Sequence, residues 1–185
     1  MEQDKADQIV AEAAKVFMRY GFRRVTMGEL AKAAGMSRPA LYLEFDSKEQ
    51  IFIEVVNRLT NENLKQIREG IARLKSVDKK LELAFEVWTV RPFEMIQSSP
   101  DAADLYDSVK EFAAEAILKS AVEFENLLAE ILELEVRKQK KLKLSAKRIA
   151  RIMRTSSKGF HLTANDASEL REMIRDMRRI VLASS

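Results

Sequence analysis

The apolar residues of this chain recur at three- and four-residue steps over most of its length. Ile9, Ala13, Val16, Phe17 and Tyr20 set this spacing near the start, as on one face of an amphipathic helix. The same period returns in four longer stretches, residues 48–73, 101–135, 145–159 and 166–183. No stretch of useful length alternates apolar and polar residues as a strand would. The pattern therefore predicts an all-α fold.

Helix start signals divide residues 26–47 into two short helices. Thr26 and Glu29 have the spacing of a capping box, in which each side chain binds the other residue's backbone amide. Gly35 ends this first short helix, and Ser37 caps the second, which tolerates Pro39 in its first turn. A further box at 47–50 opens the long helix 48–73.

Signals beyond the long helix are coarser. Asp78 can cap a helix that Pro92 should kink or end near Val90, and Pro100 is suited to the first position of the next helix. Residues 136–144 are expected to form a basic connector. Ser145 should open the helix 145–159, and Asp166 should begin a capping box for the helix 166–183.

Composition supports helices and excludes several kinds of site. Only 5 Gly and 3 Pro occur in 185 residues, so helix breakers are rare. The chain has no Cys and one His, His161, which rules out disulfides and leaves no typical zinc or iron–sulfur ligand set. We expect no metal and no cofactor. Acid–base chemistry by Asp, Glu, Lys or Tyr stays open as an alternative, but no catalytic signature converges, so the prediction is that the chain is not an enzyme.

The net charge of +3 conceals strong segregation along the chain. Residues 15–48 sum to +4, residues 101–135 to −8 and residues 137–158 to +10. A charge run is most often a solvated helix face, and this basic run lies beside the longest acidic stretch. We therefore expect the 137–158 run to pack against the acidic helix, in the same subunit or a partner. A second nucleic-acid surface is the alternative.

No targeting or membrane segment is expected. The N-terminus is acidic, and no window approaches the roughly 20 apolar residues that a membrane helix needs. With no cysteine as well, a cytoplasmic location is the prediction.

The two short helices within 26–45 have the layout of a helix-turn-helix, whose second helix enters the major groove of DNA. That second helix begins with Ser37 and Arg38, so polar donors lie at the end nearest the bases. Arginine can pair with guanine through two hydrogen bonds. Thr26 and Lys48 each lie at a helix N-terminus, where phosphate is favoured.

An ordered set of residues in this region closely resembles the DNA-binding domain of TetR-family transcriptional regulators. The set covers roughly residues 8–56 without a gap. It consists of Phe17, Tyr20, Gly21, Phe22, Val25, Thr26, Met27, Leu30, Ala31, Ala34, Gly35, Met36, Ser37, Leu41, Tyr42, Phe45, Ser47, Lys48 and Glu49.

The resemblance implies a homodimer with two functional parts. Residues 1–47 would form a three-helix DNA-binding head, and residues 48–185 an effector-binding and dimerisation domain, with helix 48–73 as connector. The head would bind a near-palindromic operator in double-stranded DNA. A small hydrophobic effector would release this repressor by favouring a conformation with separated heads.

The resemblance also implies roles for single residues. Phosphate contacts would come from Thr26, Tyr42 and Lys48, and base contacts from Ser37, Arg38, Pro39 and Ala40. Glu44 departs from the family pattern, because a carboxylate there would repel phosphate, so we expect it to turn away. The candidate effector pocket consists of Phe85, Trp88, Phe93, Met95, Tyr106, Phe112 and Phe124. The candidate dimer interface consists of Ile149, Ile152, Met153, Leu170, Met173, Ile174, Met177, Ile180 and Val181.

Other interpretations stay open. Apolar residues at helical spacing are most often ordinary core, and this applies to the pocket and interface candidates alike. The main alternative function is a helical DNA-binding or protein-interaction module without a small-molecule effector. A solid hydrophobic core in place of a pocket would favour it.

Overall fold

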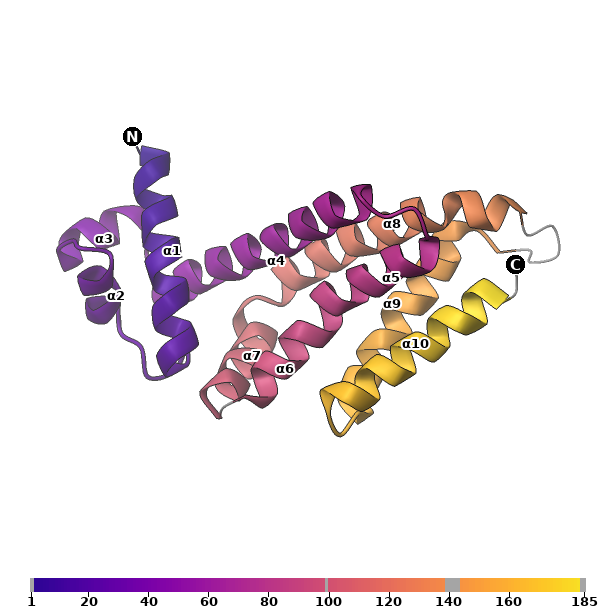
Figure 1. Ribbon diagram of the computed structural model, residues 1–185. Helices are drawn as coiled ribbons and strands as arrows, with labels where there is room; N and C mark the ends of the chain where they lie inside the picture. The colour runs from indigo at the N-terminus through magenta and orange to yellow at the C-terminus, as the bar shows by residue number, and fades with distance from the viewer. Residues whose placement is uncertain (1, 99, 139–143, 184–185) are drawn as a thin grey trace. The chain divides into compact units, whose positions relative to one another are not determined.

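The computed structural model describes residues 2–98, 100–138 and 144–183, and these form helices joined by short turns (Figure 1). Within those ranges there is no strand, so the predicted all-α fold is confirmed. The elements are α1 (Glu2–Tyr20), α2 (Met27–Ala33), α3 (Arg38–Glu44), α4 (Lys48–Ala72), α5 (Val77–Phe85), the π-helical turn η1 (Glu86–Val90), α6 (Arg91–Gln97), α7 (Pro100–Phe112), α8 (Ala114–Lys138), α9 (Ala146–Thr163) and α10 (Ala167–Ala183).

Packing divides the chain into two compact units. Unit 1 comprises Met1–Thr60 with Met95–Leu118, and unit 2 comprises Asn61–Glu94 with Lys119–Ser185. Unit 1 is larger than residues 1–47 because α7 packs against α1. The functional division at residue 48 stays a prediction, since the compact units are a statement about packing alone.

Aromatic side chains form the centre of unit 1. The Phe17 ring lies 5.7 Å from that of Phe22 and 5.3 Å from that of Phe52, measured between centroids. Phe112 of α7 lies 4.9 Å from Phe22. These contacts join α1, the turn after it, α4 and α7 into one core. Leu41 of α3 is fully buried in the same core.

Unit 2 has a separate apolar core. Phe85 of α5 and Phe124 of α8 are fully buried with their centroids 5.6 Å apart. Trp88 stacks on Phe124 at 4.7 Å. The last two helices, α9 and α10, lie side by side (Figure 1) and bury Met153 and Leu170 in this core.

Two helix boundaries in unit 2 differ from the sequence prediction. Ser76, not Asp78, caps α5, because its hydroxyl accepts the Lys79 amide hydrogen. Pro92 does not end the helical path, since α6 continues through Gln97, but η1 ends at Val90, where the sequence predicts a kink or an end. Proline lacks an amide hydrogen, and the wider turn η1 directly before α6 is an irregularity of the kind that often accompanies such a break in the hydrogen-bond ladder.

Three further boundaries are corrected around the longest helices. The segment 101–135 is interrupted at Ala113, whose side chain is buried in unit 1, and no Gly or Pro marks this break. The α8 helix runs on to Lys138, three residues into the predicted connector. The α9 helix passes Gly159 and ends at Thr163. A glycine inside a helix costs about 1 kcal/mol relative to alanine, and packing of Phe160 on the core offsets this cost.

The predicted capping boxes occur in two forms. The box at Thr26 and Glu29 has both reciprocal bonds. At the start of α4, Ser47 accepts from the Gln50 amide, but Gln50 reaches back one residue further, to the amide of Asp46. Before α10, Asp166 accepts the Glu169 amide, whereas Glu169 accepts from Asn165. The predicted helix starts are right, and only the returning bond is displaced.

Candidate nucleic-acid interface

The turn between α2 and α3 is short and fixed by backbone hydrogen bonds. The Ala34 amide donates to the Leu30 carbonyl at 2.9 Å, and the Met36 amide donates to the Ala31 carbonyl at 3.0 Å. Gly35 has φ +69°, in the left-handed region where glycine has no steric penalty. The chain can therefore reverse here and start α3 within four residues.

Burial of one face of α3 leaves the other face accessible. Leu41 has no exposed surface, so it fixes the rotation of the helix about its axis. Arg38 and Pro39 are exposed, Ala40 is partly buried, and Tyr42 is 47% exposed. Because residues four apart share a helix face, Arg38 and Tyr42 project from the same side. The candidate base-reading residues are thus presented together within unit 1.

Leu43 also belongs to this exposed face, and the sequence reasoning missed it. Its side chain is 88% exposed, the largest value among the exposed large hydrophobic residues of the described chain. It follows Pro39 by four positions, and that spacing was the available signal. An apolar side chain here can contact the methyl group of thymine.

Gly28 provides room for the Arg38 side chain. A Cβ atom at Gly28 would lie 3.6 Å from Cδ and Nε of Arg38, which is ordinary van der Waals contact. The arginine stem therefore lies over the first turn of α2. This contact gives Arg38 a defined direction while its side chain stays exposed.

Thr26 and Lys48 are already engaged by neighbouring groups. The Thr26 hydroxyl donates to Glu29 Oε2 at 2.9 Å and accepts the Glu29 amide hydrogen. These backbone and side-chain bonds to Thr26 lower the pKa of Glu29 below its ordinary value. Lys48 Nζ donates to the Phe22 carbonyl at 3.1 Å and lies 4.3 Å from the centre of the Phe22 ring. A phosphate contact by either residue would have to share its side chain with these partners.

Asp104 of α7 fixes the turn between α1 and α2, a contact for which the sequence pattern holds no signal. Its Oδ2 accepts the amide hydrogens of Phe22 at 2.7 Å and Arg23 at 3.0 Å. The Arg23 Nε also lies 3.2 Å from Asp104 Oδ1. Partners more than 80 residues apart in sequence thereby hold the start of the helix-turn-helix.

The family comparison concerns this same region. Residues 9–55 match the family described as bacterial regulatory proteins, tetR family. This range includes α2, its turn and α3, and ends within α4. Residues 9–55, about a quarter of the chain, thus resemble the DNA-binding segment of the tetR family.

Its curated relatives are named as transcriptional regulators. The transcriptional repressor KstR2 of Rhodococcus jostii is 32% identical over 103 residues, which cover 55% of this chain and 48% of the relative. The transcriptional activator FasR of Mycolicibacterium smegmatis is 27% identical over 85 residues, covering 46% of this chain and 39% of the relative. The matches thus span less than half the length of these relatives. Both relatives are named as regulators of transcription rather than as enzymes.

Solved structures extend the likeness of fold to nearly the whole chain. A transcriptional regulator from Cytophaga hutchinsonii superposes with a TM-score of 0.78, at 18% identity and 96% coverage of both chains. The fatty acid degradation regulator FadR from Bacillus halodurans gives a TM-score of 0.63 at 20% identity, covering 96% of this chain and 94% of that one. At these identities the agreement shows a shared fold and nothing about ligands.

The candidate pocket residues are divided between the two compact units. Phe85, Trp88, Phe93 and Phe124 belong to unit 2, whereas Met95, Tyr106 and Phe112 belong to unit 1. Three of the four in unit 2 are buried, and Trp88 is partly buried against the same core. Phe112 belongs to the aromatic cluster of unit 1. In unit 2, Phe124 packs against both Phe85 and Trp88, as core residues do.

The candidate dimer residues fall into two groups. Ile149, Met153, Leu170, Ile174 and Met177 are buried within the subunit, which is the core packing that the sequence left open as an alternative. Ile152 is 51% exposed and Ile180 is 70% exposed, while Met173 and Val181 are partly buried. Only the second group could lie in a surface between subunits.

The described part of the basic run packs against the acidic helix, as predicted. Glu125 of α8 is buried, and its two carboxylate oxygens accept from Arg151 Nε at 3.2 Å and Arg154 Nε at 3.1 Å. Arg137 pairs with Glu133 one turn earlier on α8. Lys140, Lys141 and Lys143 lie outside the described residues.

Two further features are absent from the described ranges. Those ranges contain no group of three or more His, Asp or Glu side chains arranged to hold a metal ion. Nor does any helix there combine the length and apolar character that crossing a bilayer demands. The ring of His161 packs edge-on against Phe93 at the edge of the unit 2 core, with centroids 5.0 Å apart.

Proposed function

We propose that this protein is a transcriptional regulator that binds a near-palindromic operator in double-stranded DNA through α3. The observation that carries the proposal is the exposed face of α3, with Arg38, Pro39, Tyr42 and Leu43 held outward by the buried Leu41. This face lies within the residues that match the family. In the proposed complex Arg38 reads a base, and Tyr42 and Lys48 contact phosphates.

Binding to DNA from upstream of the protein's own gene tests the proposal. Fluorescence anisotropy with an operator duplex and a scrambled duplex gives affinity and discrimination together. Arg38→Ala should lower discrimination about tenfold or more, since a good bidentate base contact contributes about 1–3 kcal/mol. Arg148→Ala on α9 is the matched control, because it removes the same charge outside unit 1 and should leave both affinities unchanged.

Phosphate contacts predict a different result. Tyr42→Phe and Lys48→Ala should weaken binding to both duplexes by a similar factor, and Lys48→Ala should reduce the salt slope. Equal loss on both duplexes for Arg38→Ala would remove its base-reading role. An affinity for DNA that is unchanged by all three substitutions would contradict DNA binding by α3.

Leu43 supplies a test of the apolar part of this face. If it contacts a thymine methyl, Leu43→Ala should weaken binding to the operator more than to the scrambled duplex. Leu43 has little buried surface to lose, so its replacement should leave the free energy of unfolding nearly unchanged. An unchanged operator affinity would exclude Leu43 from the interface.

We also propose that the protein acts as a homodimer through α9 and α10. Support comes from Ile152 and Ile180, which expose apolar surface on these two helices. Ile180→Glu should shift the sedimenting species from dimer to monomer. Leu134→Glu on α8 is the control, because Leu134 is equally exposed at 70%. A monomeric wild-type protein, or a dimer insensitive to Ile180→Glu, would contradict this interface.

The finer proposal is a repressor released from DNA by a small apolar effector bound beside Trp88. Trp88 is the only tryptophan, so its fluorescence reports on unit 2 alone. An apolar effector should change that emission and weaken operator binding, and both changes should follow the same dependence on effector concentration. The close packing of Phe85, Trp88 and Phe124 favours the alternative, a DNA-binding module without an effector. Operator affinity unaffected by an apolar compound library would support that alternative.

A further inference from the structure

A polar cavity of about 440 Å³ opens between α5 and α10 within unit 2. Its charged lining comes from Asp78, Lys79 and Glu82 of α5 and from Arg175, Arg178 and Arg179 of α10. A smaller cavity of about 70 Å³ shares Glu82, Arg175 and Arg178 with it. This site differs in chemistry from the apolar pocket that the sequence predicted.

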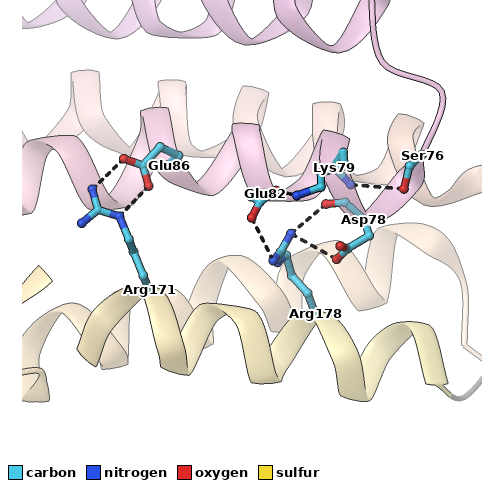
Figure 2. A network of polar contacts seen from close by, with 7 residues as sticks. All are labelled: Ser76, Asp78, Lys79, Glu82, Glu86, Arg171 and Arg178. Atoms are coloured by element: carbon cyan, nitrogen blue, oxygen red, sulfur yellow. Dashed lines mark hydrogen bonds and ion pairs between the residues drawn. The ribbon is translucent and has the colours of Figure 1, made fainter. Parts of the chain in front are cut away.

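Arg178 is the buried centre of this lining, with 4% of its surface exposed. Its Nη1 donates to the Asp78 carbonyl at 2.8 Å and lies 3.1 Å from the Asp78 carboxylate, and Nη2 lies 3.6 Å from Glu82 (Figure 2). The Nε hydrogen has no acceptor among the described atoms. A buried donor without a partner is costly, so this atom calls for an oxygen that the described chain does not supply.

The remaining cations give the cavity an excess of positive charge. Four cationic and two anionic side chains line it. Lys79 donates to Glu82 at 2.6 Å, and Arg179 pairs with Asp176 at 3.5 Å. Within the described residues Arg175 makes no hydrogen bond or ion pair, although its charge attracts Glu82, and it lines both cavities. The hydrogen bond from Lys79 lowers the pKa of Glu82. The Glu82 carboxyl is therefore ionised near neutral pH and counts as one of the two anionic side chains of the lining.

We propose that this cavity binds a small oxyanion, a carboxylate or a phosphate, between Arg175 and Arg178. An oxyanion balances the excess positive charge of the lining and gives Arg175 an acceptor, beside the Arg178 side chain whose Nε has none. Guanidinium groups suit both ligand types, because their donors match the spacing of carboxylate and phosphate oxygens. As a ligand site the cavity stands without the proposed regulatory function; only its use as an effector site would rest on that function.

Calorimetric titration of the full chain with inorganic phosphate and, separately, with succinate tests the site. Sodium chloride holds the ionic strength equal in all titrations, and no DNA is present, so operator binding does not affect the outcome. Saturable binding of either anion at one site per chain supports the proposal, and the anion that binds more tightly identifies its chemistry. Absence of saturable binding by both overturns the proposal.

Three variants locate the binding. Arg175→Gln should weaken the affinity at least tenfold, since it removes a charged donor from an exposed position. Arg178→Lys keeps the charge but removes Nε, and it should weaken the affinity by a similar factor. Arg148→Gln, an exposed arginine of α9 outside both linings, should bind as the wild type does.

The arginine variants also keep the proposal open to refutation. Circular dichroism establishes that each variant is folded before titration. If Arg178→Lys does not fold, the difference in anion affinity between Arg175→Gln and Arg148→Gln is sufficient to test the site. Equal affinities for these two glutamine variants would show that binding follows overall charge and would overturn the site.

Discussion

The polar contacts of unit 1 are made largely to backbone groups, whereas those of unit 2 join charged side chains on different helices. In unit 1, Asp104 accepts two backbone amide hydrogens and Lys48 donates to a backbone carbonyl. In unit 2, Arg171 pairs with Glu86 of η1, 85 positions away in sequence. Backbone contacts fix the path of the chain, which suits a head that must present α3 rigidly. Side-chain pairs can exchange partners, which suits a ligand site.

The largest expected effects concern the cores, where the two units should not differ. Phe17→Ala in unit 1 and Phe124→Ala in unit 2 should each lower the free energy of unfolding by about 3–5 kcal/mol, because each leaves a cavity around a fully buried ring. Urea unfolding followed by circular dichroism measures both. Met18→Ala, at a residue 41% exposed, should cost far less. A small loss for only one phenylalanine would mean that polar contacts dominate that unit.

The next effect tests the backbone contacts of unit 1. Asp104→Ala should lower the free energy of unfolding by about 1.5–3 kcal/mol, since hydrogen bonds to a charged group are lost and the amide of Phe22 keeps no acceptor. Asp107→Ala is the control on the same helix, because Asp107 is exposed and, among the described residues, pairs with Lys110 alone at 3.4 Å. Equal losses for the two variants would contradict a special role for Asp104.

A smaller effect is expected for the side-chain pairs of unit 2. Arg171 forms two hydrogen bonds to Glu86 and an ion pair to Glu94, and these partners raise its pKa. Since its side chain is 39% exposed, solvent screening limits the coupling between Arg171 and Glu86 to about 0.5–1 kcal/mol. A double-mutant cycle with Arg171→Gln and Glu86→Gln measures it. The coupling should fall with added salt, and a salt-independent value would contradict a screened pair.

The smallest effect is a pH dependence at the capping box of α2. The pKa of Glu29 is lowered from 4.5 in the folded protein by its bonds to Thr26. A depressed folded pKa gives stability that is complete above the unfolded pKa and is lost as pH falls through the folded value. Glu29→Gln should therefore remove part of the loss of stability between neutral and acid pH. Thr26→Ala should have the same effect in urea unfolding at several pH values, and a wild-type pH profile in both variants would refute the coupling.

Local contacts made much of the fold predictable. Thr26 and Glu29 are three residues apart, and Gly35 takes its left-handed conformation between two helices as its position indicated. The exposed face of α3 follows from Leu41 being the buried residue of a short helix. The sequence reasoning failed where a boundary depended on distant packing, as where Phe160 draws α9 past Gly159.

The candidate sites show the same division. Arg38 and Tyr42 share a face because four residues make about one helical turn, whatever the rest of the molecule does. The seven aromatic and methionine residues proposed for one pocket share only their chemistry, and packing assigns them to two units. Their helical spacing could not distinguish a pocket from a core, since both require apolar side chains at the same positions.

By itself, the sequence determined the helical class, the helix-turn-helix and its exposed residues, because each depends on groups within a few positions of one another. Tertiary structure alone decided that Asp104 holds the turn before α2 and that Arg178 is buried against α5. Those contacts join residues about 80 to 100 positions apart. A carboxylate or guanidinium on a helix surface looks alike in sequence whether it faces water or a partner. Only the tertiary fold determines which of these charged side chains is buried against a partner.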